Sequence, residues 1–189
     1  AGVYGFFIST DLFTMFMFYE VALIPMYLLI GVWGSGQKEY AAMKLTLMLM
    51  GGSAFLLIGI LGIFYGAGAE TMNILEIAQR HIPTEMQRLF FPLIFLGFGV
   101  LGALFPFHTW SPDGHASAPT AVSMLHAGVL MKLGGYGCFR VAMYLMPEGA
   151  EIWGNFFLVL TTISVVYGAF SAVVQTDLKY INAYSSVSH

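Results

Sequence analysis

Two ionisable residues lie deep inside long apolar stretches of the sequence, where a charge is expensive. Glu20 is the ninth residue of the stretch Leu12–Trp33, and Lys132 lies well inside Ala116–Met143. A charge at the centre of a membrane helix costs about 2.5–3.5 kcal/mol on insertion scales. Intramembrane acids and lysines often relay protons or ions, although a structural pair between two helices would also explain them. We therefore predict proton transfer as the chemistry of Glu20 and Lys132, with a structural ion pair as the alternative.

The residue types suit this chemistry. A lysine side chain has an ordinary pKa of ~10.4, and loss of water around it lowers that pKa by as much as several units. Burial shifts a glutamate in the opposite direction, so a Glu–Lys pair that forms and breaks can act as a protonation switch. Pro25 follows Glu20 by five residues and predicts a kink near the acid. Tyr136 follows Lys132 by four residues, on the same helical face.

Three histidines add side chains that titrate near neutral pH. His108 and His115 flank the segment TWSPDG, which we interpret as a break, and they could carry protons or cap helix ends. His126 precedes Lys132 by six residues, which is about 120° around an ideal helix, so we interpret it as a packed histidine. The histidine spacings lack a nearby Cys or carboxylate pattern typical of a metal site, and we predict no metal.

Several further residues are candidate auxiliaries of proton transfer. Lys44 lies near the start of an apolar stretch, where snorkelling to the membrane surface is as reasonable as a place in the pathway. The chain has neither a glycine-rich nucleotide motif nor a Cys-x-x-Cys pair, so we expect no cofactor bound to it. The full set of auxiliary candidates is Lys44, Asp113, Tyr136, Asp177 and Lys179.

The elements that must position these residues are predicted to be membrane helices. The 189 residues are 58% hydrophobic and only 9% charged, against about 25% charged in soluble domains. A net charge of −3 gives no argument for a nucleic-acid partner. Period-two alternation is absent, so we predict an all-α, multi-pass transmembrane bundle that forms a single membrane domain over residues 1–189. The predicted spans are Leu12–Trp33, Ala41–Tyr65, Leu89–Phe107, Ala116–Met143 and Ile152–Val174.

The connections between these spans are polar or broken by proline and glycine. Gly66–Arg88 carries an expected short interfacial helix, on the apolar residues Met72, Leu75, Ile77 and Ala78, which Pro83 should end. Pro106, Pro112 and Gly114 predict a break after the third span, and Pro119 fits the first turn of the fourth. The other predicted connections are Gly34–Tyr40, Pro147–Glu151 and Gln175–Tyr180, with a further helix from Ile181.

Three stretches of the chain resemble one known family. They are STDLFTMFMFYEVALIPMYLLIGVWG, FPFHTWSPDGHASAPTAVSMLHAGVLMKLGGYG and QTDLKYINAYSSVSH, in this order. Together they resemble the antiporter-like membrane subunits of proton-translocating NADH-quinone oxidoreductase (respiratory complex I), chain M or chain 4. The resemblance implies a bundle of about fourteen helices built from two inverted five-helix repeats. We expect this chain to be an internal piece covering most of the first repeat.

The resemblance also implies roles for single residues. Glu20 corresponds to a key charged residue of the family, and Lys132 to its central relay lysine. His108 and His115 correspond to histidines that line or gate a hydrated path, and His189 to a histidine of the next helix. The expected partners are other membrane subunits, lipid, water and protons, in the inner or plasma membrane of a bacterium. FMN, Fe–S clusters and quinone are expected in other subunits of the complex.

The chain departs from the family pattern at Leu101. Family members usually carry a lysine at this position, seven residues before the His108 histidine, and that lysine pairs with the acid at Glu20. Another cation could replace it, with Lys44 a candidate by charge alone. Alternatively Glu20 is neutral through loss of water, or this half-channel works differently.

The leading prediction is a proton-translocating subunit of an NADH-quinone oxidoreductase, coupled to quinone reduction elsewhere in the complex. One alternative is a subunit of a multisubunit Na⁺/H⁺ antiporter or of a membrane-bound hydrogenase, which share this fold. Another is an antiporter-like scaffold that does not pump. The leucine at position 101, where the family usually has a lysine, is the reason to consider it.

Overall fold

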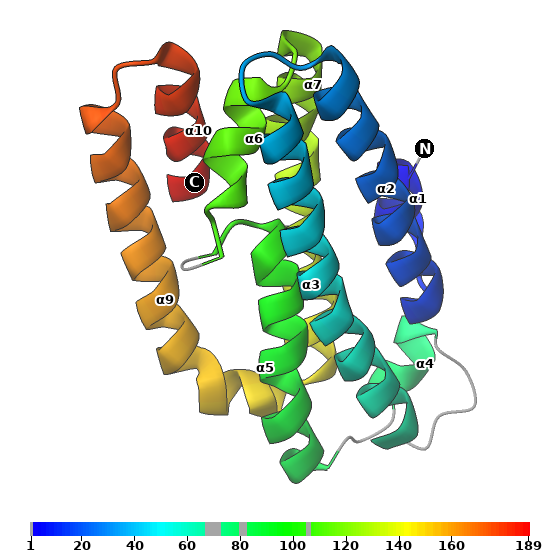
Figure 1. Cartoon of the computed structure of the whole chain (residues 1–189). Coiled ribbons are helices and arrows are strands. Elements are labelled where there is room, and N and C mark those ends of the chain that lie inside the picture. Colours follow the sequence, from blue (N-terminus) through cyan, green and yellow to red (C-terminus); the bar gives the residue numbers. More distant parts are fainter. Residues whose placement is uncertain (1, 67–72, 80–82, 105–106) are drawn as a thin grey trace.

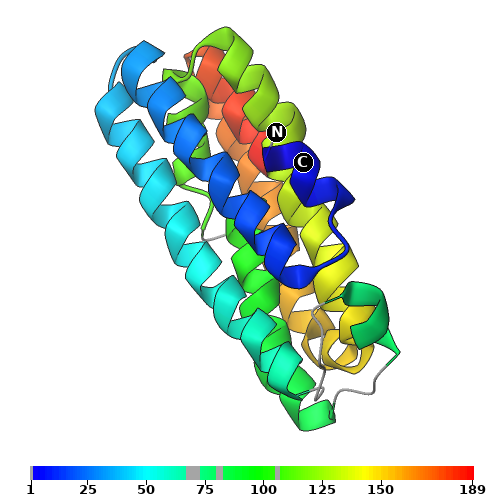
Figure 2. The same cartoon turned by 90° about the vertical axis from the view of Figure 1, so that its right-hand side faces the viewer.

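The protein is a bundle of roughly antiparallel helices (Figures 1 and 2). The computed structural model describes residues 2–66, 73–79, 83–104 and 107–189. The predicted all-α transmembrane bundle is confirmed, and four helices in these ranges are long and apolar enough to cross a membrane: α2, α3, α5 and α9. The helical segments are α1 (Gly2–Ile8), α2 (Leu12–Trp33), α3 (Lys38–Gly66), α4 (Ile74–Ala78), α5 (Thr84–Leu101), α6 (Trp110–Ser117), α7 (Thr120–Leu125), the π-helical turn η1 (His126–Leu130), α8 (Met131–Gly137), the π-helical turn η2 (Cys138–Met143), α9 (Pro147–Val174) and α10 (Leu178–Ser188).

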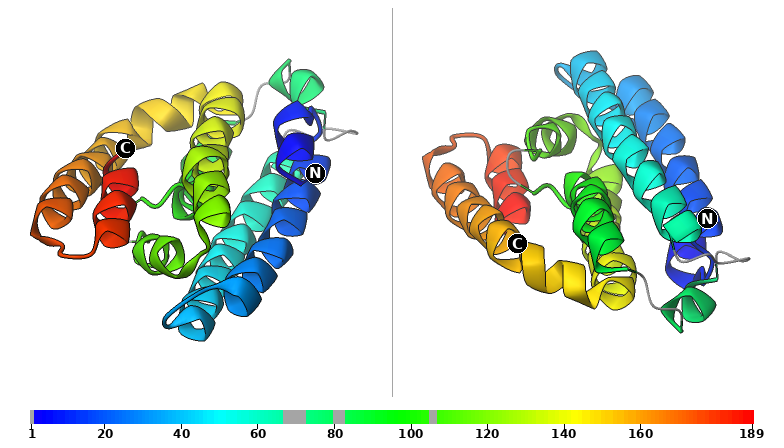
Figure 3. Two further views of the ribbon diagram at one scale, coloured as in Figure 1. Left: turned by 90° about the horizontal axis from the view of Figure 1, so that it is seen from above. Right: turned by 90° about the horizontal axis from the view of Figure 1, so that it is seen from below.

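The helices form three groups when the bundle is viewed along its length. Figure 3 shows α2 and α3 on one side, α9 and α10 on the other, and α5 to α8 between them. The span predicted over Leu12–Trp33 coincides with α2, whose first turn is capped by the side chain of Asp11. α2 packs against α3, where the Tyr19 hydroxyl donates a hydrogen bond of 3.2 Å to the carbonyl of Leu49.

The third span ends earlier than the sequence predicts. The predicted range Leu89–Phe107 is wrong at both ends, because α5 runs from Thr84 to Leu101. A Schellman motif ends this helix: the Leu104 N–H donates to the Gly99 carbonyl at 2.8 Å, and the Ala103 N–H donates to Val100. Ala103 has a φ of 63°, the left-handed conformation that glycine usually supplies at this position. Pro106, part of the predicted break, lies outside the described residues.

The predicted break at TWSPDG is a buried helix instead. α6 spans Trp110–Ser117, and Pro112 lies in its first turn, where a missing N–H costs no intrahelical hydrogen bond. Trp110 is fully buried, and its indole N–H donates at 2.9 Å to the carbonyl of Val100 in the last turn of α5, which also accepts the Ala103 N–H. The break therefore lies between α5 and α6, which follow each other along the bundle (Figure 1).

The fourth span is helical but irregular. It begins after Pro119 at Thr120, rather than at Ala116, and residues 120–145 are continuously helical. Two π-helical turns, η1 and η2, flank α8 within this run. A π-turn adds one residue to the helical turn and is found frequently at functional sites. The predicted carrier of Lys132 is thus present, with a disturbed backbone on both sides of α8.

The ends of the last helices also differ from prediction. The loop expected at Pro147–Glu151 is wrong, because Pro147 occupies the first turn of α9, where proline is favourable. The Gln87 side chain accepts a hydrogen bond of 2.9 Å from the Gly149 N–H in that turn. α10 starts at Leu178 instead of Ile181, because Asp177 caps its first turn through the Lys179 N–H.

The expected interfacial helix is reduced to one short segment. α4 contains Leu75, Ile77 and Ala78, and the side chain of Asn73 caps it. Met72 lies outside the described residues. Pro83 does not end this helix; it directly precedes the first residue of α5.

Candidate functional site

An ion pair joins the second turn of α3 to the short buried helix α6. The Lys44 Nζ of α3 lies 2.9 Å from the Asp113 Oδ2 of α6. The Tyr180 hydroxyl of α10 donates to the other carboxylate oxygen of Asp113 at 3.3 Å. The side chains of Lys44 and Asp113 are 25% and 27% exposed. Lys44 therefore reaches a protein partner instead of snorkelling to a membrane surface, and one carboxylate connects three helices.

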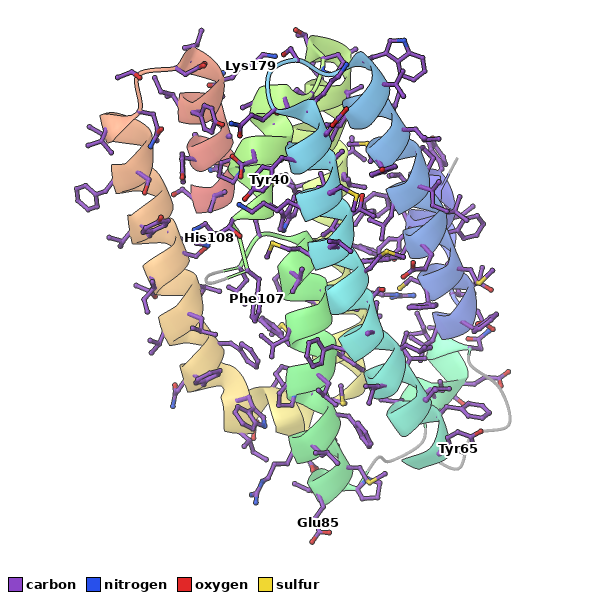
Figure 4. All side chains as sticks on the ribbon, in the orientation of Figure 1. Tyr40, Tyr65, Glu85, Phe107, His108 and Lys179 are labelled. Atoms are coloured by element: carbon purple, nitrogen blue, oxygen red, sulfur yellow. The ribbon has the colours of Figure 1, made fainter. Side chains whose placement is uncertain are left out.

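His108 lies beside this pair, about midway along the bundle (Figure 4). Its side chain is buried, and its ring packs edge-on against Tyr167 of α9 with 4.9 Å between ring centroids. Lys44 and His108 interact electrostatically, which places the two side chains near each other. The structure thus brings together three of the predicted residues, Lys44, Asp113 and His108, near the interruption between α5 and α6.

His115 faces a different side of α6. Its Nε2 lies 3.4 Å from the sulfur of Met131, the residue before Lys132, and the Ser111 hydroxyl lies 3.7 Å from the same sulfur. The side chain of His115 is buried. It therefore packs between α6 and α8, where it contacts the helix that carries Lys132.

Lys179 and Asp177 tie α10 to the rest of the site. The Lys179 Nζ donates to the carbonyl of Ala118 at 3.1 Å and to that of Ala116 at 3.5 Å, at the C-terminal end of α6. A lysine at this position favours the helix because its charge complements the helix dipole. Asp177 acts as the N-cap of α10. These two predicted auxiliaries thus hold helix ends in place.

Glu20 is separated from the cations of the site. One of its carboxylate oxygens, Oε1, is buried without a hydrogen-bond partner, and among the described side chains it forms no salt bridge. Lys44, the substitute considered from charge, pairs with Asp113. Leu101 is 1% exposed and belongs to the apolar core. The position where the family carries a lysine is therefore filled by packed hydrocarbon.

Glu20 and Leu101 lie at similar depths in the bundle. The residue before Glu20, Tyr19, is hydrogen-bonded to α3 at Leu49, and a Cβ placed on Gly52 of α3 would touch Val100, the residue before Leu101. Both contacts fall within one turn of α3. The two helices α2 and α5 thus present the acid and the leucine at the same level.

Lys132 projects from α8 on an exposed face. Gly134, two residues further on, packs on the opposite face, where a Cβ would collide with the backbone of Gly102 and Phe98. Tyr136 donates at 3.3 Å to the carbonyl of Phe7 on α1 and packs against the ring of Phe7. The predicted face shared by Lys132 and Tyr136 thus turns toward α1 and the outside of the bundle.

His189, at the end of α10, lines a groove of about 360 Å³ together with Gly134 and Gly135 of α8. The groove lies between the ends of α5 and α10 and the middle of α8 and α9. His189 therefore approaches the helix of Lys132 without a described bond to the lysine. The side chain of His126 lies outside the described residues.

Sequence reasoning missed the tyrosines and the methionine of the site. Tyr180 and Met131 each contact a predicted residue, Asp113 and His115, and Tyr184 stands 6.5 Å from Tyr167 between ring centroids. A signal for Tyr180 was present, since it follows the predicted pair Asp177 and Lys179 in the motif QTDLKY. Within the described ranges, no group of three His, Cys, Asp or Glu side chains could hold a metal ion.

Comparison with known proteins identifies the family. Residues 9–189 match the family described as NADH:quinone oxidoreductase/Mrp antiporter, TM. The chain is 42% identical over 190 residues to NAD(P)H-quinone oxidoreductase chain 4, chloroplastic, of Citrus sinensis, which covers 100% of this chain and 38% of that protein. It is also 42% identical over 186 residues to NAD(P)H-quinone oxidoreductase chain 4 3 of Picosynechococcus sp., covering 98% of this chain and 34% of the relative. The chain thus spans little more than a third of these relatives.

Solved structures share the same fold. A chain of respiratory complex I from Thermus thermophilus with bound NADH superimposes with a TM-score of 0.91 at 30% identity, over 97% of this chain and 39% of that one. A chain of the archaeal membrane-bound sulfane sulfur reductase gives a TM-score of 0.91 at 29% identity, over 99% of this chain and 39% of that one. Because the family match covers nearly every residue, and these structures superimpose along the same length, the chain belongs to the NADH:quinone oxidoreductase/Mrp antiporter transmembrane family.

Proposed function

We propose that the chain forms part of a proton-translocating membrane subunit of an NADH-quinone oxidoreductase. Both reported relatives are named as chain 4 of an NAD(P)H-quinone oxidoreductase, and one superimposed chain comes from a respiratory complex I. In this proposal, redox energy released in other subunits shifts the protonation of buried side chains here, and protons cross the membrane by way of water.

The observation that carries the proposal is the polar connection inside an apolar bundle. Lys44 and Tyr180, from two different helices, both bond to Asp113 of a third, and His108 lies about midway along the bundle (Figure 4). Ionisable groups inside membrane helices are expensive and commonly serve proton or ion pathways. Lys132 adds a mid-span lysine on a helix that two π-helical turns interrupt. We assign proton transfer to these side chains and to Glu20, His115 and His189.

The redox groups belong to other subunits in this proposal. The chain itself would carry no FMN, Fe–S cluster or quinone, and its partners would be the neighbouring membrane subunits, lipid, water and protons. The apolar helices support a membrane location, and we propose the plasma membrane of a bacterium. The chloroplast relative from Citrus sinensis makes a chloroplast membrane the other outcome to test by fractionation.

The function is tested with Lys132→Ala in the full-length subunit, assembled in its complex and reconstituted in vesicles. We expect proton uptake per NADH oxidised to fall by about 10²-fold, the scale of a lost proton-transfer group. Lys38→Ala is the matched control, because Lys38 lies at the start of α3 and reaches only the carbonyl of Val32 at 3.5 Å. Undiminished proton uptake in an assembled Lys132→Ala complex would contradict the function.

A non-pumping scaffold is the second candidate, and one specific observation favours it. Glu20 has a buried oxygen without a partner, and the family lysine is replaced by the core residue Leu101. A scaffold would leave proton uptake unchanged in both Lys132→Ala and Glu20→Gln, with normal assembly. Loss of uptake in either variant favours the pump.

A further inference from the structure

A polar cavity opens at one end of the bundle, away from the apolar grooves of its flanks. Its volume is about 300 Å³, and it lies where the connections α2–α3 and α9–α10 meet the C-terminal half of α6. Its lining comes from three parts of the chain, residues 35–41, 113–117 and 177–180, and contains many polar side chains. The side chains that could bind water there are Ser35, Gln37, Tyr40, Asp113, Asp177 and Tyr180.

The inner wall of this cavity is the carboxylate of Asp113. Oδ2 of this carboxylate binds the Lys44 ammonium at 2.9 Å, and Oδ1 accepts the Tyr180 hydroxyl at 3.3 Å. A cavity of this volume holds several waters, since one water takes about 30 Å³ in the liquid. Water in the cavity would therefore meet a carboxylate that is already paired with a cation on its other side.

The ion pair leads from the cavity toward the centre of the membrane. Figure 4 shows Lys179 near one end of the bundle, Tyr40 further in and His108 about midway. Lys179 and Tyr40 line the cavity, Lys44 lies over the Tyr40 ring at 5.5 Å, and the charge of Lys44 acts on His108. The Asp113 carboxylate and the Lys44 ammonium are therefore in direct contact and lead from the cavity into the bundle.

A larger groove, of about 650 Å³, cannot serve the same purpose. It runs along α9, and its lining is mainly hydrocarbon, with Ile163, Val166 and Phe170. A hydrocarbon surface offers no hydrogen bonds to water or to ions, so this groove is better suited to lipid or to a neighbouring helix. The cavity at Asp113 is therefore the better candidate for a hydrated path.

We propose that the cavity at Asp113 is a water-filled vestibule and that Asp113 is the first side chain to take a proton from that water. This inference rests on the proposed function and adds where protons enter. A hydronium ion gives its proton to the Asp113 carboxylate, which neutralises the counter-ion of Lys44. The Lys44 ammonium, now without a counter-ion, gives a proton to water on its inner side, and the Asp113 proton passes to the Lys44 amine. One proton has moved from the cavity past Asp113 and Lys44, and the ion pair is restored.

The first experiment introduces a cysteine at the cavity wall. Gln37→Cys lines the vestibule, whereas Glu39→Cys is a matched control two residues away that lines a separate pocket with Tyr27 and Leu28. Both variants carry Cys138→Ser and are studied in the assembled, reconstituted complex. A membrane-impermeant, positively charged methanethiosulfonate reagent is added to the side that exposes this end. We expect modification of Gln37→Cys to lower proton uptake at least tenfold and that of Glu39→Cys to leave it unchanged.

The second experiment tests Asp113 itself and covers the case in which the cysteine variant fails to assemble. Asp113→Asn keeps the size of the side chain but removes the titratable group. We expect it to lower proton uptake at least tenfold, while Asp113→Glu recovers most of the uptake. Asp11→Asn is the control, because Asp11 caps α2 away from the cavity and asparagine is an equally good helix N-cap, and it should pump normally.

Several outcomes overturn the vestibule. Full proton uptake after modification of Gln37→Cys, or in assembled Asp113→Asn, rejects it, and so does a block that affects ²²Na⁺ uptake while proton uptake persists. The result for Lys132→Ala separates this failure from that of the proposed function. If Lys132→Ala abolishes uptake and the vestibule variants do not, only the vestibule is wrong; if Lys132→Ala also pumps normally, the proposed function fails as well.

Discussion

Lys44 of α3 and Asp113 of α6 form an ion pair of 2.9 Å across 69 positions of sequence. The pair holds a helix of only eight residues, which would be marginal by itself, because isolated helices shorter than about 12–15 residues are unstable. Tyr180 and Lys179 secure the same helix from α10, at Asp113 and at the last carbonyls. The contact therefore stabilises α6, and in the proposed function the same pair also takes part in proton transfer.

The stability of this contact can be measured with a double-mutant cycle of Lys44→Met and Asp113→Asn. Each single variant should lower the free energy of unfolding by about 1–2 kcal/mol, below the 3–5 kcal/mol of a fully buried pair, because water reaches a quarter of each side chain. The double variant should lose less than the sum, since neither charge is left unpaired. Thermal unfolding in detergent measures all four proteins, and additive losses would show that the pair is not coupled.

Lys179 should stabilise the C-terminal end of α6. Lys179→Met removes its bonds to the carbonyls of Ala116 and Ala118 and its charge at the helix terminus. We expect a loss of about 0.5–1.5 kcal/mol in the free energy of unfolding, the usual net contribution of such contacts. Lys179→Arg keeps charge and donors and serves as the control. Equal unfolding temperatures for the methionine and arginine variants would contradict this role.

Two adjacent glycines near Lys132 should respond differently to alanine. Gly134 packs against the backbone of Gly102 and Phe98, so a methyl group there forces α8 away from the end of α5. We expect Gly134→Ala to destabilise the protein by about 1–3 kcal/mol, the range of overpacking. Gly135 has open space around its Cα, so Gly135→Ala should be neutral or stabilising by about 0.4–1 kcal/mol. The melting temperatures of the two variants test this, and a Gly134→Ala variant as stable as Gly135→Ala would contradict it.

Restoring the family lysine at Leu101 should reveal whether Glu20 is available as a partner. Leu101→Lys places an ammonium in the core at the depth of Glu20, and we expect the assembled complex to be retained because the carboxylate can pair with it. In the Glu20→Gln background the same lysine is unpaired, and assembly should fall steeply, since a lone buried charge costs about 3–5 kcal/mol.

Ile94→Lys is the control for this prediction, because Ile94 is fully buried on α5 two turns away, at the level of Gly59. It should impair assembly equally with Glu20 and with Gln at position 20. Equal assembly of Leu101→Lys in both backgrounds, measured on native gels, would show that Glu20 and Leu101 do not face the same space.

Much of the fold was predictable from runs of apolar residues. The range of α2 matches its prediction, and α3 and α9 contain the predicted spans, because a long apolar helix in lipid has to satisfy every backbone hydrogen bond within itself. The errors fall where a tertiary contact overrides local composition. α5 stops at Leu101 through a left-handed Ala103, and TWSPDG forms a helix from Trp110 onward because Trp110 bonds to the carbonyl of Val100 and proline is tolerated in a first turn.

The sequence by itself determined a membrane bundle and the list of ionisable residues inside it, since hydropathy and the cost of intramembrane charge depend only on residue type and on position along each span. It did not determine which of these charges meet. Only the tertiary structure decided that Lys44 pairs with Asp113, that Glu20 lies apart from both, and that Lys132 points away from the Gly134 contact. The reason is geometric. Close packing between segments that are distant in the sequence sets the rotation of each helix and the ends of α5 and α6, and the composition of one segment does not specify that packing.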